Sequence, residues 1–597
     1  MSRFYSLLLV TVLLFATLPV HAASDLPWDE EARLLMHIAY LASDAREGRG
    51  IGTDGLEASA TYIENRFAED GLEPLFDNSY SQSFTVGWGA TILPNTYIAN
   101  ANDSLGSGDS FRPAGFSTTA VAVKPVVFAG YGITADEYDY DDYADLDATD
   151  KIVIVFTGEP RRDDPDALFS GDYDTDHATL RTKAINAKMH GAAGLLIIPS
   201  PAEADSLPEL RAKEPYRDSG IPVAFVTRAA AAKLFPRLGL DKLYRSMELN
   251  QAPRSQTLGD DTLTLAVELQ RNEIPVRNVG AMIPGDDRVL IFGAHYDHLG
   301  YGQSGSRVPG VHEIHNGADD NASGVSVLLE LARVLTMNPP GPTILFVAFT
   351  GEEAGLVGSS YFVNNPPLSL DLANLMVNFD MVGRMQNNTL TVYGVESADG
   401  LRELATEAGR DVPVELALTG GGYGASDQTS FYTHGLPVLH FLTSLHGDYH
   451  RPEDDIAEIN GDGLVRVLQY AVSLAETFAG HRDELVYQAA EEPNAEGRHT
   501  KRRVAMGTIP DFTQPDSLSG FRLQGVRPGT PADEAGLQAM DIVIAIDDVL
   551  IDNIYDLTYA MGKYEPGDEV TIRYRRGSDE FETRLTFAEA SGRGHGG

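Results

Sequence analysis

Five short segments of this chain group carboxylate and imidazole side chains in a way that could bind divalent metal ions. Each segment adjoins an apolar run, and in an α/β protein the functional groups gather where the strands end. The donors are oxygen-rich, include histidine and contain no sulfur, so they suit zinc first and manganese or cobalt second. In chain order the segments are 294–297 (AHYD), 317–324 (GADDNASG), 350–353 (TGEE), 378–380 (NFD) and 448–452 (DYHRP).

The first segment follows a strand-like run, VLIFGA, and carries His295 and Asp297. Residues two apart on a strand point to the same side. We therefore expect Asp297 to accept a hydrogen bond from the imidazole of His295 and to fix its tautomer. A lone His-x-Asp pair is more often an ordinary strand-end histidine, so the pair is informative only beside the other segments. The nearby His298, His312 and His315 are interpreted as loop residues.

The next two segments each carry adjacent carboxylates. Asp319 and Asp320 precede a run with helical periodicity, VSVLLELARVL, so one of them could simply cap that helix and leave the other for a metal. Glu352 and Glu353 follow an apolar strand, TILFVAF. Buried neighbouring carboxylates repel each other unless a cation is present. We expect one glutamate to bind metal and the other to take a proton from a metal-activated water; a solvated loop is the alternative.

The last two segments follow two further predicted strands. Asp380 ends the run LMVNF, and His446 and His450 follow the run VLHFL. Neither segment is diagnostic alone, because strand-end aspartates often cap helices and histidines often pack. Five such groups at the ends of apolar runs in one region are hard to explain as coincidence. Together they predict a two-metal site.

The order H-x-D, GADDNASG, GEE, NFDMVG and DYHxPED resembles that of the co-catalytic di-zinc exopeptidases, peptidase family M28. This family includes leucyl-type aminopeptidases, glutamate carboxypeptidase and, more distantly, glutaminyl cyclase. The resemblance covers about 278–481 and implies two Zn²⁺ ions, bridged by a hydroxide, that Mn²⁺ or Co²⁺ could replace. The implied roles are Asp320 as the bridging ligand, His295 and Asp380 on one metal, Glu353 and His450 on the other, Glu352 as general base, Asp297 as the partner of His295, and Tyr449 as the group that polarises the scissile carbonyl.

Two further regions resemble known modules. The segment KMHGAAGLLII resembles the protease-associated (PA) domain, and GTPADEAGL followed by DIVIAID resembles a bacterial PDZ domain. Such a PDZ domain would bind peptide C-termini at the loop Gly507–Ile509, although a purely packing role is the alternative. Gly420–Gly424 is expected to form a wall of the substrate pocket. The predicted domains are a signal peptide (1–22), a peptidase domain in two parts (24–115 and 254–483), an inserted PA domain (116–253), a linker (484–503), a PDZ domain (504–588) and a tail (589–597).

The predicted fold class is α/β. We expect a mixed, mostly parallel central sheet with helices on both faces, the zinc exopeptidase fold, together with an α/β PA domain and a β-rich PDZ domain. The 597 residues contain no cysteine, so stability must come from hydrophobic cores rather than disulfides. The net charge of −42 argues against nucleic acid and anionic membrane surfaces as partners.

The N-terminal segment predicts where the protein acts. Residues 1–22 have an early arginine, an apolar stretch and a small-residue cleavage site, which are typical of a secretory signal peptide. No other stretch is long and apolar enough for a transmembrane anchor. We therefore expect an exported protein, periplasmic or secreted, that acts on peptide substrates.

Three functions remain open from the sequence. The first is an exported aminopeptidase. The second is a carboxypeptidase or a glutaminyl-cyclase-like member of the same family, because motif spacing does not place the loops that recognise the substrate's end. The third is a peptide-binding protein whose PA and PDZ modules act and whose metal site is vestigial. The presence of both Glu352 and Glu353 argues against the third.

Overall fold

The computed structural model describes residues 29–135, 138–161, 167–169, 175–208, 219–302, 305–308, 311–481, 485–488, 504–511, 514, 518–527, 529–551 and 554–589. The predicted signal peptide, most of the predicted linker 484–503 and nearly all of the tail 589–597 lie outside these residues. Within them, no helix combines the length and the apolar character that crossing a membrane requires.

The described residues form a nine-stranded main sheet whose central strands are parallel to one another. The strands flanking this centre, β13 and β17, run antiparallel to their inner neighbours, and β17 pairs parallel with the edge strand β18. Strand β14 lies between β15 and β16 and runs parallel to both, and β19 runs parallel to β16. In sheet order the strands are β1 (Glu73–Pro74), β13 (Leu269–Ile283), β15 (Pro342–Phe349), β14 (Asp286–His295), β16 (Ala373–Phe379), β19 (Val438–Leu442), β17 (Thr389–Tyr393) and β18 (Glu415–Leu418), with β2 (Ser81–Ile92) paired to β13.

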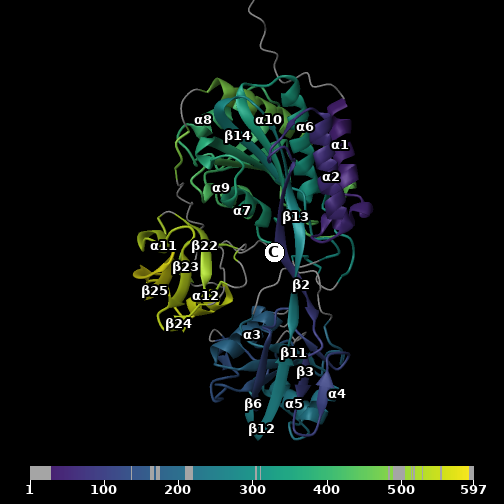
Figure 1. Ribbon diagram of the computed structural model, residues 1–597, viewed down its shortest axis with the longest axis vertical. Helices are drawn as coiled ribbons and strands as arrows, with labels where there is room; N and C mark the ends of the chain where they lie inside the picture. Colours follow the sequence, from purple (N-terminus) through teal and green to yellow (C-terminus); the bar gives the residue numbers. More distant parts are fainter. Residues whose placement is uncertain are drawn as a thin grey trace, which may run out of the picture.

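Helices cover both faces of this sheet (Figure 1). Alternate residues of β14 point into different cores, because side chains on a strand alternate between its faces. Phe292 packs in the core that contains the first group of helices, and Ile291 packs on the opposite face with Phe362 and Phe431 of the second group. The predicted α/β fold class is therefore confirmed. The first group is α1 (Asp29–Leu41), α2 (Asp54–Glu69), α6 (Gly324–Met337), α8 (Leu401–Ala408) and α10 (Gly461–Gly480); the second is α7 (Val357–Asn364) and α9 (Gln428–Tyr432).

A second, eight-stranded sheet lies below the main sheet in Figure 1 and is joined to it by the long strands β2 and β13. Its strands come from residues 97–267, so this unit is wider than the predicted insertion 116–253. Strands β3 to β5 precede that range and β12 follows it. In sheet order the strands are β4 (Ser104–Gly106), β3 (Tyr97–Ala99), β12 (Gln256–Val267), β6 (Ala120–Phe128), β9 (Ile152–Phe156), β10 (Gly194–Ile198), β11 (Val223–Val226) and β5 (Phe111–Pro113), and the helices are α3 (Leu180–Met189), α4 (Arg228–Leu234) and α5 (Leu240–Asn250).

The C-terminal unit is β-rich, as the sequence predicts, and its strand pairs are all antiparallel. Strand β21 lies at the edge of its main sheet, next to β22. The elements are β20 (Val504–Ala505), β21 (Thr508–Pro510), β22 (Phe521–Val526), α11 (Pro531–Glu534), β23 (Ile542–Ile546), β24 (Val549–Leu550), α12 (Ile554–Met561), β25 (Glu569–Arg576), β26 (Asp579–Thr586) and β27 (Ala588–Glu589).

This C-terminal unit is packed against the other two units rather than held only by a linker. Ile509 of β21 lies in the same core as Phe431 of α9. The amide of Gln524 donates a buried hydrogen bond of 3.0 Å to the hydroxyl of Ser430. On the other side, Lys188 of α3 forms an ion pair of 2.9 Å with the buried Asp556 of α12. The position of the C-terminal unit is therefore fixed by both apolar and charged contacts.

Candidate metal centre

The predicted metal ligands lie together at one edge of the main sheet. Because β15, β14, β16 and β19 run parallel, their carboxyl ends meet at the same edge. Asp320 joins them from a turn, residues 318–323, that leads into the buried first turn of α6. The positions are His295 at the end of β14, Glu352 and Glu353 after β15, Asp380 directly after β16, and His450 in the loop after β19.

The carboxylate of Asp320 lies between two sets of donors. Its Oδ1 is 3.3 Å from His295 Nε2, and its Oδ2 is 3.2 Å from His450 Nε2. His295 Nε2 is also 3.4 Å from an oxygen of Asp380, and His450 Nε2 is 3.1 Å from Oε2 of Glu353. One oxygen of Asp320 thus faces each set, as a ligand shared by two ions would.

These separations are compatible with zinc coordination. Zn–N and Zn–O bonds are about 2.0–2.2 Å long, so two ligand atoms of one tetrahedral ion lie about 3.3 Å apart. The separations in the two sets, 3.1 to 3.4 Å, are close to that value. The residues therefore fit two metal ions, with His295, Asp320 and Asp380 at one position and Asp320, Glu353 and His450 at the other.

The carboxylates and imidazoles of the site shift one another's pKa values. Burial alone would raise the pKa of Asp320, but the three imidazoles around it hold that pKa well below its usual range. Burial alone would lower the pKa of His450, but the carboxylates of Glu353 and Asp320 raise it to about 11. Without metal, the ligands therefore pair as carboxylates with imidazolium ions. A bound cation would take over the role of those protons.

Glu352 differs from the other acidic groups of the site. Burial, together with the neighbouring Glu353, raises the pKa of Glu352 well above its usual range, against the opposing effect of His295. Its carboxylate lies within 4.8 Å of donor atoms of His295 and Asp380. A carboxylate that binds a proton readily and lies beside a metal position is suited to act as a general base.

Main-chain carbonyls orient the two predicted histidine ligands. His450 Nδ1 donates to the carbonyl of Gly305 at 2.9 Å, and His295 Nδ1 lies 3.2 Å from the carbonyl of Asp297. The carboxylate of Asp297 is farther from that nitrogen, at 3.8 Å, and instead accepts the backbone N–H of Glu352 at 3.1 Å. The sequence predicts the carboxylate as the partner of His295, so the structure differs here. The side chain of Asp297 fixes the loop that carries Glu352.

Two residues near the metal positions have no predicted role. His298, interpreted from the sequence as a loop residue, is buried, and its Nδ1 lies 2.8 Å from Oε1 of Glu353. Arg49 is completely buried, and its guanidinium donates to the main-chain carbonyls of Leu41, Tyr296, Asn316 and Gly317 at 2.7 to 2.8 Å. Arg49 therefore ties the N-terminal region to the chain just after His295 and just before the turn that carries Asp320. The flanking glycines, Gly48 and Gly50, were the only sequence signal for it.

Two further acidic residues support the turn that carries Asp320. The carboxylate of Asp454 accepts the backbone N–H groups of Asp319 and Asp320 at 3.0 Å. Asp319 accepts the N–H of Gly383 and lies 3.3 Å from His446 Nε2. Asp319 and His446 thus form a pair beside the metal positions, and Asp320 alone of the two adjacent aspartates faces the predicted histidine ligands.

Tyr449 lies beside His450, with the two rings stacked at a centroid distance of 3.8 Å. Burial and the nearby Asp320 raise the pKa of Tyr449, so its hydroxyl remains a hydrogen-bond donor. In the predicted pocket wall Gly420–Gly424, Tyr423 is buried against Tyr432, and its hydroxyl reaches the carbonyl of Val526 in the C-terminal unit at 3.5 Å. The wall therefore contacts the C-terminal unit.

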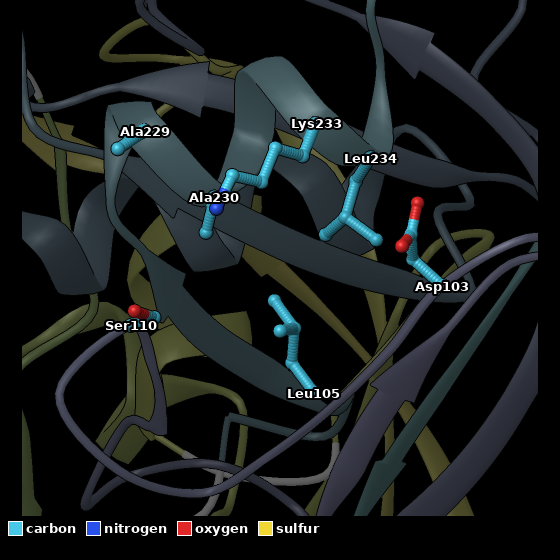
Figure 2. Close-up of a pocket in the computed structure, with 7 residues that line it drawn as sticks. All are labelled: Asp103, Leu105, Ser110, Ala229, Ala230, Lys233 and Leu234. Carbon is cyan, nitrogen blue, oxygen red and sulfur yellow. The ribbon is translucent and has the colours of Figure 1, made fainter.

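A separate small cavity of about 90 Å³ lies in the eight-stranded unit (Figure 2). It is lined by apolar side chains together with Lys233, Ser110 and Asp103. None of the predicted metal ligands lines it. This cavity is thus distinct from the metal centre.

Comparison with known families gives three matches along the chain. Residues 278–475 match the model of peptidase family M28, residues 118–234 match the PA domain, and residues 504–586 match a PDZ domain. The first of these ranges contains every residue predicted to bind metal or to act in catalysis.

Individual relatives match parts of the chain. Aminopeptidase YwaD of Bacillus subtilis is 31% identical over 219 residues, which cover 34% of this chain and 44% of the relative. A probable zinc metalloprotease of Leptosphaeria maculans is 29% identical over 233 residues, 32% of this chain and 52% of the relative. The chain thus spans about half the length of these curated relatives.

Among solved structures, an aminopeptidase from Aneurinibacillus sp. strain AM-1 is 22% identical to this chain. The matched region covers 77% of this chain and 96% of the aminopeptidase chain, with a TM-score of 0.46. The zinc aminopeptidase BSAP from Bacillus subtilis is also 22% identical to this chain. Here the matched region covers 78% of this chain and 99% of the BSAP chain, with the same TM-score of 0.46.

Proposed function

We propose that this protein is a metallo-exopeptidase with two zinc ions that removes N-terminal residues from peptides. Residues 278–475 belong to peptidase family M28, and the chain also carries the PA and PDZ domains that the sequence predicts. One observation carries this proposal: the two oxygens of Asp320 face His295 and His450 at 3.3 and 3.2 Å. A shared carboxylate between two donor sets is what a co-catalytic pair of ions requires.

The residues of the chain supply the proton transfers of hydrolysis. When bound, two zinc ions provide Lewis-acid activation of water and of the substrate carbonyl. Glu352 accepts a proton from the attacking water and returns it to the leaving amine, which balances the reaction. Asp297 holds the backbone of Glu352 in place, and Tyr449 donates a hydrogen bond to the carbonyl oxygen as charge develops on it.

We propose that cleavage starts at the N-terminus. The carboxylates of the site can bind a free ammonium group, and the name of one relative, aminopeptidase YwaD, indicates this direction for that protein.

The test of this direction compares aminoacyl arylamides and free peptides with their N-acetylated forms, each with zinc present. We expect turnover only of substrates with a free N-terminus. Equal turnover of acetylated peptides would contradict this direction and favour a carboxypeptidase. Loss of ammonia from N-terminal glutamine, without peptide cleavage, would favour a cyclase.

A binding protein with a vestigial metal site remains the alternative from another class. Its support is the presence of the PA and PDZ domains, but it leaves the shared carboxylate and Glu352 without a role. If the zinc-loaded protein binds peptides and hydrolyses none of the substrate panel, this alternative replaces the exopeptidase.

We propose that the PDZ domain binds peptide C-termini. Strand β21 pairs only with β22 among the described strands, so an extended peptide could add to its other edge, with its carboxylate at the loop Gly507–Ile509. The test uses one peptide with a free or an amidated C-terminus. A lower KM for the free form is expected, since capture raises the local substrate concentration. Equal KM values would indicate that the domain serves packing alone.

We also propose that the protein is exported, on the strength of the signal-like segment 1–22. N-terminal sequencing of protein recovered from a bacterial periplasm or medium should show a start just after Ala22. Recovery of the intact N-terminus only from the cytoplasm would contradict export.

A further inference from the structure

His298 is a buried histidine for which the proposed reaction has no role. It lies three residues after His295, and its side chain has no exposed surface. Its Nδ1 is 2.8 Å from Oε1 of Glu353. Its Nε2 has no hydrogen-bond partner among the described residues. Glu353 is therefore the partner to which the ring directs its hydrogen bond.

The ring of His298 is held in one orientation. Its backbone N–H donates to the carbonyl of Arg49 at 3.2 Å, so the buried arginine fixes the loop at this point. A Cβ atom on Gly317 would lie 2.5 Å from a ring carbon of His298, which shows how closely the imidazole packs on that glycine. The ring also meets His450 edge to face, with centroids 5.8 Å apart. A ring enclosed on these sides presents its donor at a fixed place.

The separations distinguish a hydrogen-bond donor from a metal ligand. Two ligands of one tetrahedral zinc ion lie about 3.3 Å apart, as the predicted ligands do. His298 and Glu353 are closer, at 2.8 Å, which is an ordinary length for a hydrogen bond to a carboxylate. His298 Nδ1 is also 3.8 Å from Asp320 Oδ2, too far for a hydrogen bond. The geometry favours donation to Glu353 over coordination.

A donor on Oε1 determines how Glu353 faces the metal. The terminal torsion of a glutamate is broad, so a carboxylate without a fixed partner samples many orientations. With His298 on Oε1, the other oxygen, Oε2, faces His450 Nε2 at 3.1 Å. The two histidines thus contact different oxygens of one carboxylate, and Oε2 is left pointing at His450, on the side where a cation would bind.

We propose that His298 is a positioning residue of the metal centre: its Nδ1–H orients Glu353 and so sets the affinity of the ion held by Glu353 and His450. The proposal rests on the proposed function, because it assumes that this position binds metal. Hydrogen-bonded partners of ligands typically change metal affinity by roughly 10–100-fold when they are removed. We expect an effect of that size on one ion only, because His298 contacts no ligand that belongs solely to the other position.

The test compares His298→Leu with His298→Asn by chelator competition, which gives the Kd of each zinc ion without any activity assay. Leucine resembles asparagine in shape but has no donor, whereas the amide nitrogen of asparagine occupies nearly the place of Nδ1. We expect His298→Leu to weaken one ion by roughly 10–100-fold and His298→Asn to restore most of that affinity. Thermal unfolding of the metal-free variants shows whether each one is folded.

His37→Leu is the matched control. His37 is another buried histidine hydrogen-bonded to a glutamate, Glu330, but it lies in α1 and contacts no predicted metal ligand. Its loss should lower the melting temperature and leave both zinc affinities unchanged. Unchanged affinities in His298→Leu would overturn the proposal. Equal weakening in both His298 variants would also overturn it, in favour of direct coordination. Wild-type protein that bound no zinc would contradict the proposed function itself.

Discussion

Replacing the two adjacent glutamates separately tests whether Glu352 acts as the general base and Glu353 as a metal ligand. Glu352→Gln keeps the size of the side chain and the backbone hydrogen bond to Asp297, but the amide cannot take a proton from water. We expect kcat/KM to fall by roughly 10²–10⁴, the contribution of a positioned general base. That loss corresponds to about 2.7–5.5 kcal/mol in the activation free energy. Metal content should not change, since Glu352 is not one of the five residues assigned as metal ligands, His295, Asp320, Glu353, Asp380 and His450.

Glu353→Gln should behave differently. It removes a negative charge 3.1 Å from His450 Nε2, so the protein should bind fewer zinc ions while the amide still accepts from His298. The assay pairs turnover of an aminoacyl arylamide with elemental analysis of the same protein samples. Glu57→Gln, an exposed carboxylate paired with Arg277, is a control expected to change neither quantity. If Glu352→Gln and Glu353→Gln lose metal to the same extent, the two glutamates do not have the separate roles of base and ligand.

Three other substitutions test the supporting structure. Asp320→Ala should abolish binding of both ions, measured by elemental analysis; retention of one ion would show that the carboxylate is not shared. Arg49→Lys keeps the charge but loses part of the fork of donors, so urea unfolding should show a loss of about 1–3 kcal/mol for each carbonyl left unpaired; a change within about 0.5 kcal/mol would contradict that role. Lys188→Met leaves the buried Asp556 without its cation from α3 and should speed limited proteolysis of the C-terminal unit; unchanged cleavage would mean that the apolar contacts suffice.

The sequence predicts the strands of the site closely because their apolar runs are nearly continuous. The predicted strand 438–442 matches β19, and the run 343–349 differs from β15 by one residue. The order of residues along the chain is therefore enough to place the ligands that follow these strands at one edge of the sheet. Each of these ligands is positioned by a strand whose burial is evident from its apolar residues.

Side-chain direction and long-range support were not predictable in the same way. No local pattern distinguishes the carbonyl of Asp297 from its carboxylate as the partner of His295. His298 looks like any loop histidine, because its contact with Glu353 joins residues 55 positions apart. Arg49 acts on carbonyls more than 240 residues away, with no periodicity to reveal it. The eight-stranded unit also extends beyond the predicted insertion, since the short strands β3 to β5, at or next to its edges, differ little in composition from loops.

Anomalous diffraction at the zinc absorption edge, from crystals grown with zinc, tests the two-metal site most directly. Two peaks about 3.5–4 Å apart are expected, one beside His295 and Asp380 and the other beside Glu353 and His450, with Asp320 between them. A single peak, or two peaks that do not share Asp320, would contradict the two-metal site.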